Sequence, residues 1–114
     1  MVSAHDAVRS YPELVEVAAL RASGWRFMPL RREDVLAGLM GFCQAGEDTL
    51  DALYVFDRDD CRAVRLLAEE PGTPGGIVWE YHGALAAAVH QLRSLPPPTD
   101  PHAPRLVLRP WRAL

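Results

Sequence analysis

The sequence predicts one α+β domain with two layers, in which a three- or four-stranded, mostly antiparallel sheet packs against three helices. The first observation is size and composition: 114 residues leave room for one domain, and 49% hydrophobic with 24% charged residues are ordinary globular values. The second is pattern, because stretches with helical spacing of apolar residues occur between short apolar stretches typical of strands. We place the domain at residues 1–95 and a proline-rich extended arm at residues 96–114.

The first predicted helix covers residues 11–23, with Ser10 as its N-cap and Gly24 as its stop. Residues 25–28 alternate in polarity, so we expect a strand there, and Pro29 ends it. Both elements belong to the same small domain.

Residues 36–43 fit either a helix face or a strand. Gly38 and Gly41 weaken a helix, and residues 44–48 are typical of a hairpin loop leading into a clear strand at residues 49–56. Because that strand needs a hairpin partner, we favour a strand at 36–43, with a helix as the alternative.

A second helix is predicted after Asp57, which can cap it. Cys61, Val64 and Leu67 recur at helical spacing and mark its buried face. The order strand, helix, strand from residue 50 to 81 allows a right-handed crossover between parallel strands as well as a meander. The last strand and helix are expected at residues 77–81 and 84–95. The core candidates are Trp25, Tyr54, Val55, Ile77, Trp79 and Leu92.

Glu80 and His82 are the candidate catalytic residues. Along a strand, Ile77, Trp79 and Tyr81 share one face, whereas Glu80 and His82 share the other, where they could act as orienter and general base. No serine or cysteine lies in a recognisable nucleophile motif. We therefore favour a solvent-facing role for Glu80 and His82, and predict no catalytic residue.

Arg58, Arg62 and Arg65 would share one face of the helix predicted after Asp57. Such a face could bind an acidic partner or a phosphate backbone. Acidic residues on the same helix and a net charge of -3 favour a solvated face, so nucleic-acid binding is the less favoured alternative.

Several chemistries are not expected. Cys43 and Cys61 form no CxxC pair, and the histidines show no ligand spacing, so we expect no metal and no cofactor. The chain contains no lysine, which excludes a P-loop. With no signal peptide and no apolar run long enough for a bilayer, we expect a cytoplasmic protein without membrane contact.

The proline run at residues 96–104 predicts an extended, polyproline-like segment, and residues 105–109 can add an edge strand. Leu106, Leu108 and Trp111 suit an interface. The edge can belong to the same molecule or to a neighbour, and we favour the neighbour, which gives a homodimer.

Several stretches together resemble small actinobacterial proteins of unknown function, between Gly24 and Leu108: Gly24-Trp25, Asp51-Ala52-Leu53, Gly76-Ile77-Val78-Trp79-Glu80, Leu95-Pro96-Pro97-Pro98 and Ala103-Pro104-Arg105-Leu106-Val107. The resemblance implies a cytosolic protein of a high-GC bacterium, consistent with all 12 basic residues being arginine. It implies no activity. Because no catalytic or cofactor motif is present, the sequence predicts a non-catalytic protein-interaction or regulatory module. The alternatives are a small-molecule enzyme using Glu80 and His82, and a weak nucleic-acid-binding protein.

Overall fold

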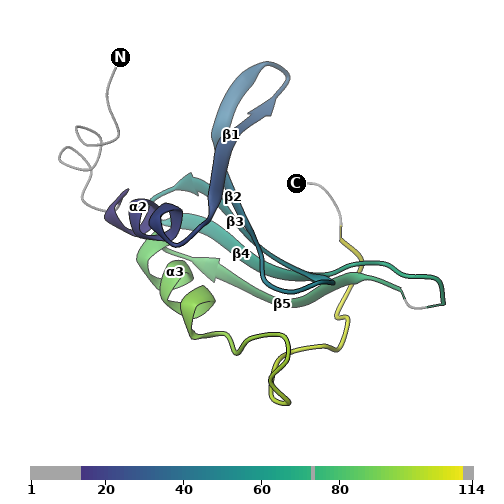
Figure 1. The fold of residues 1–114 in the computed structure, drawn as a ribbon. Helices are drawn as coiled ribbons and strands as arrows, with labels where there is room; N and C mark the ends of the chain where they lie inside the picture. The colour runs from purple at the N-terminus through teal and green to yellow at the C-terminus, as the bar shows by residue number, and fades with distance from the viewer. Residues whose placement is uncertain (1–13, 73, 112–114) are drawn as a thin grey trace.

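A computed structural model describes residues 14–72 and 74–111. Helix α2 leads into five consecutive strands, and helix α3 follows the last strand (Figure 1). The bounds are α2 Leu14–Ala22, β1 Arg26–Arg32, β2 Val35–Gln44, β3 Thr49–Asp57, β4 Asp60–Leu67, β5 Gly76–Gly83 and α3 Leu85–Ser94.

The five strands form one sheet in chain order, β1-β2-β3-β4-β5, and each pairs antiparallel with the next. The expected sheet of three or four strands with three helices is therefore wrong, since the described residues hold five strands and two helices. The alternative of a parallel crossover is wrong as well. The class remains a small α+β fold.

The segment after Asp57, where a helix is predicted, forms the strand β4. Instead of capping a helix, Asp57 accepts a hydrogen bond from the Arg58 amide at 2.7 Å in a tight turn, and β4 returns beside β3. Cys61, Ala63 and Val64 are all fully buried, so this central strand is apolar on both faces. A strand buried on both sides loses its alternation, which is why its apolar spacing resembled that of a helix.

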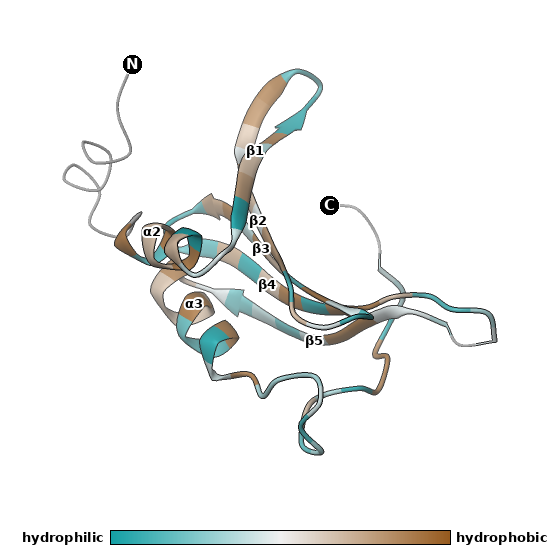
Figure 2. Cartoon of the chain, in the orientation of Figure 1, coloured by the Kyte–Doolittle hydropathy of each residue, from teal (hydrophilic) through white to brown (hydrophobic). Residues whose placement is uncertain are grey.

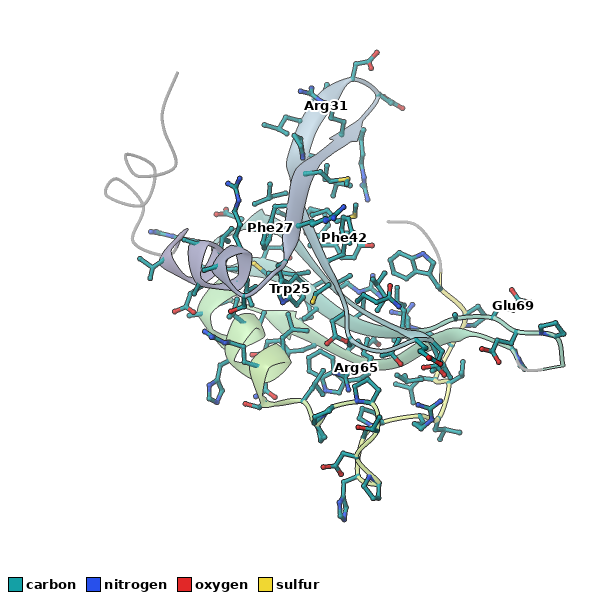
Figure 3. All side chains as sticks on the ribbon, viewed as in Figure 1. Trp25, Phe27, Arg31, Phe42, Arg65 and Glu69 are labelled. Carbon is teal, nitrogen blue, oxygen red and sulfur yellow. The ribbon has the colours of Figure 1, made fainter. Side chains whose placement is uncertain are left out.

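The segment at residues 36–43 is a strand, as favoured. Gly41 lies beneath the ring of Phe27, its partner across the β1–β2 pair, and a methyl group there would overlap the ring (Figure 3). A methyl group at Gly38 would overlap the backbone carbonyl of Val55. Gly38 and Gly41, which would weaken a helix, therefore allow neighbouring strands to approach β2 closely.

The first strand does not end at Pro29. It continues to Arg32, because β1 is an edge strand, where proline is tolerated. The two-residue turn Glu33–Asp34 has positive φ at both positions (50° and 63°), as a tight hairpin turn of the primed type requires.

One face of the sheet is covered by α3, and α2 packs beside α3 and adds Leu20 to the same core. The core on that side contains Leu20, Leu53, Cys61, Ala63, Leu85, Ala88, Val89 and Leu92. Of the predicted core residues, Leu92 belongs to this cluster, and Trp25, Val55 and Trp79 pack against it while half-buried. The predicted start of the first helix, at Ser10 and residues 11–13, lies outside the described residues.

The other face carries no helix, and we call it the open face. Its buried residues are Ala52, Tyr54, Val64 and Ile77. Ile77 does not share a face with Trp79, contrary to the prediction, because the register shifts between Arg65 and Leu66 opposite this part of β5.

The C-terminal segment folds back on its own molecule. Residues 98–103 form turns, in which Asp100 donates to the Pro97 carbonyl, so the expected extended run is wrong. Further on, Leu108 donates to the Ile77 carbonyl (2.7 Å) and Ile77 donates to the Arg109 carbonyl (2.9 Å). The predicted edge strand at 105–109 is thus reduced to a single bridge on β5.

Candidate functional site

Glu80 and His82 both point to the open face, where β4 and β5 pair, but they bind different partners. A carboxylate oxygen of Glu80 accepts from Arg62 at 3.2 Å and also from Arg109. The Nε2 of His82 lies 2.8 Å from Asp60. The structure therefore does not bring Glu80 and His82 into the pair that a general base with its orienter requires.

These side chains border a shallow groove of about 520 Å³, lined by Phe56, Asp60, Arg62, Glu80, Tyr81, His82 and Arg109. Cys61 follows the groove residue Asp60 in the sequence, but its thiol is on the opposite, helix-covered face and is fully buried. Burial, and then the carboxylates of Asp60, Asp57 and Asp59, raise the pKa of the Cys61 thiol to about 11. Cys61 is consequently a protonated core residue at neutral pH and no nucleophile for this groove.

The arginines predicted to share a helix face are separated in the structure. Arg58 lies in the β3–β4 turn, Arg62 on the open face and Arg65 on the helix-covered face. Arg65 is only 3% exposed and binds Asp51 through two hydrogen bonds of 2.7 and 3.0 Å (Figure 3). It also donates to the Pro96 carbonyl at 2.6 Å, so it ties the sheet to the C-terminal segment.

The predicted interface residues of the tail have different surroundings. Leu106 and Leu108 are strongly exposed, at 79% and 58%. Trp111 stacks on Tyr54, with ring centroids 5.8 Å apart, and so covers part of the open face.

The sequence interpretation missed a projecting part of the sheet. Pairing of β2 with β3 begins only at Leu39, so β1 and β2 continue as an isolated two-stranded ribbon (Figure 1). We call residues 31–37 the hairpin arm, because Leu30 still packs against the open-face cluster and Gly38 lies against the Val55 carbonyl. Val35 and Leu36 on this arm are 66% and 62% exposed, and Met28 at its base is 42% exposed. Figure 2 shows both hydrophobic and hydrophilic stretches on the arm, with the hydrophilic residues at its end.

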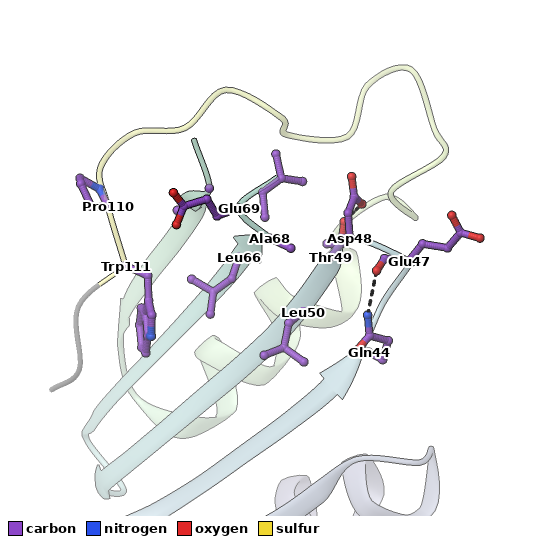
Figure 4. A pocket seen from close by; sticks show the side chains of 13 residues that line it. Gln44, Glu47, Asp48, Thr49, Leu50, Leu66, Ala68, Glu69, Pro110 and Trp111 are labelled. Carbon is purple, nitrogen blue, oxygen red and sulfur yellow. Dashed lines mark hydrogen bonds between the residues drawn. The ribbon is translucent and has the colours of Figure 1, made fainter. Parts of the chain in front are cut away.

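A second groove, of about 530 Å³, lies on the open face at the opposite end of β3 from the hairpin arm (Figure 4). It is bordered by Trp111 and by residues from the β2–β3 loop and the ends of β3 and β4. No short motif marks it, because its lining comes from four separate parts of the chain.

Among residues 14–72 and 74–111, no group of three metal-binding side chains comes together, and no helix is long and apolar enough to cross a membrane. The sequence matches no family model, no curated protein and no solved structure. Fold and surfaces together define a small α+β domain with one face of its sheet under helices, one open face and a projecting hairpin that exposes Val35 and Leu36 beside charged residues.

Proposed function

We propose that this protein is a non-catalytic protein-binding module of the cytoplasm that engages its partner through the hairpin arm. The observation that carries the proposal is the exposure of Val35 and Leu36, where β1 and β2 leave the rest of the sheet. Consecutive strand residues point to opposite faces, so each face of the ribbon carries one exposed large apolar side chain, of the kind that protein interfaces bury on binding.

The charge of β1 indicates what kind of partner fits. This strand carries Arg26, Arg31 and Arg32 and no acidic residue, and all three arginines are exposed. Glu33 and Asp34 in the exposed turn balance Arg31 and Arg32, so an apolar surface whose border carries both signs of charge is complementary to the arm. Pro29 interrupts the donors of the edge strand, so contact through side chains is favoured over addition of a full strand.

The other two function classes receive less support. An enzyme would need Glu80 and His82 to converge with a nucleophile, and they bind Arg62, Arg109 and Asp60 instead. A nucleic-acid site would need a common arginine face, which the fold divides between a turn and two faces of the sheet.

In the homodimer predicted from the tail, Leu106, Leu108 and Trp111 would contact the sheet of a second copy instead of the sheet of their own chain. The two hydrogen bonds to Ile77 and the stacking on Tyr54 support docking within the molecule. Exchange of the tail between two copies would reuse the same contacts, so the molecular mass in solution distinguishes the two arrangements.

The arm is tested with the double variant Val35→Ser, Leu36→Ser in the native host, with Val15→Ser as a matched control, since Val15 is an exposed valine on α2. We expect the wild type and the control to elute in a complex larger than the free chain, and the double variant to elute free. A complex that persists in the double variant would overturn the assignment of the arm.

A further inference from the structure

The groove of about 530 Å³ at the end of the open face has an apolar floor (Figure 4). Leu50 and Leu66 are register partners across β3 and β4 and line it side by side. Trp111 borders it on the side of the C-terminal segment, and its stacking on Tyr54 holds the indole against the sheet. The volume lies within the usual range for small-molecule sites.

The rim of this groove is acidic. Its lining contains Glu47, Asp48 and Glu69 but no arginine or histidine. Asp48 accepts hydrogen bonds from Thr49 (2.8 Å) and Arg105 (3.0 Å), so its charge is already compensated. Glu47 and Glu69 form no salt bridge within the described part of the chain, which leaves the groove with an excess of negative charge.

These features have a common complement. An apolar floor favours an aliphatic stem, carboxylates favour a positive charge, and an indole ring attracts a cation over its face. An anionic ligand would instead meet two uncompensated carboxylates. The negative charge of the lining thus favours a cationic ligand, and the apolar floor favours a ligand with an aliphatic stem.

We propose that this groove binds an organic cation, an alkylammonium or guanidinium group carried on an apolar stem. The stem lies on Leu50 and Leu66, and the cationic head lies toward Glu69 and the ring of Trp111, while Glu47 adds negative charge from the opposite side of the groove (Figure 4). The proposal does not depend on the hairpin arm, which extends from the other end of β2 and β3.

Titration with butylguanidinium, followed by NMR of the three indole N–H groups, tests the site directly. We expect the Trp111 signal, assigned by its loss in Trp111→Phe, to shift with a dissociation constant on the order of millimolar, while Trp25 and Trp79 stay unchanged. Butylurea, which has a similar shape but no charge, should shift it little. A blocked arginine-containing tripeptide replaces butylguanidinium in a parallel titration, and tighter binding of one of the two probes identifies a peptide or a free small molecule as the natural source.

The variant Glu47→Gln, Glu69→Gln removes the uncompensated charge and should weaken butylguanidinium binding about three- to tenfold. Glu70→Gln is the matched control, because Glu70 is exposed and adjacent to Glu69 but does not line the groove. No shift of the Trp111 indole with either cationic probe, or equal affinity in the double variant and the control, would overturn the proposal.

Discussion

The inner strands β3 and β4 and the hairpin arm contain the same types of apolar residue, buried in the strands and exposed on the arm. Leu53 and Val64, in β3 and β4, are fully buried, whereas Leu36 and Val35, in β2, are 62% and 66% exposed. The central strands have neighbours on both sides and α3 against one face. The two strands of the arm pair only with each other, and neither α2 nor α3 packs on them. The exposed apolar residues of the arm therefore contribute little to the stability of the fold.

This contrast indicates where stability and binding are located. A two-stranded ribbon is marginal in water unless other structure covers it. The molecule keeps such a ribbon projecting from a well-packed core, with apolar side chains at its end. We infer that the core holds the fold and leaves the arm available for a partner.

The largest expected effect comes from the buried ion pair that closes the core. Asp51→Ala leaves the guanidinium of Arg65 buried without its carboxylate, and we expect the free energy of unfolding to fall by about 3–5 kcal/mol. Urea denaturation measures it. Glu80→Ala on the open face is the comparison, since its partners Arg62 and Arg109 reach solvent, and its loss should stay below about 1 kcal/mol. Equal losses would contradict the division into core and surface.

The same substitution, leucine to alanine, can be made in the core and on the arm. Leu53→Ala empties space in the core and should cost about 3 kcal/mol, whereas Leu36→Ala on the arm should change the stability by less than about 0.5 kcal/mol. Thermal or urea unfolding of both variants gives the values. A cost above about 2 kcal/mol for Leu36→Ala would show that the arm is part of the stabilising core.

A smaller effect concerns pH. Burial raises the pKa of Cys61 from 9.0 to about 11, so the fold favours the neutral thiol. The stability that this provides is complete below pH 9 and is lost as the pH rises from 9 through 11. We expect the stability of Cys61→Ser to fall less steeply over this range than that of the wild type. Tyr54, whose pKa burial also raises, contributes equally to both proteins, and parallel curves would contradict the prediction.

The parts predicted correctly are those with an unambiguous local pattern. Helix α3 shows a 3.6-residue period, and β3 is rich in aromatic and β-branched residues. The strand β4 was mistaken for a helix because apolar residues on both of its faces remove the two-residue period. The hairpin arm is not predicted by the local pattern, because proline usually ends a strand, whereas the edge strand β1 tolerates Pro29.

The partners of Glu80 and Arg65 could not be predicted either. A hydrogen bond from Arg65 to Asp51, or from Arg109 to Glu80, depends on strand register and on the path of the C-terminal segment. The register of β4 with β5 shifts between Arg65 and Leu66, and no local sequence pattern predicts this shift. The site residues were therefore visible in the sequence, while their pairing depended on the tertiary fold.

Site-specific photo-crosslinking in the host tests the central claim most directly. A photoreactive amino acid is placed at Leu36 on the arm or at Val15 on α2, two exposed apolar positions in different parts of the molecule. We predict one discrete crosslinked protein from position 36 and none from position 15. Crosslinks from position 15 alone, or none from position 36 in a correctly folded protein, would contradict the assignment of the hairpin arm as the binding surface.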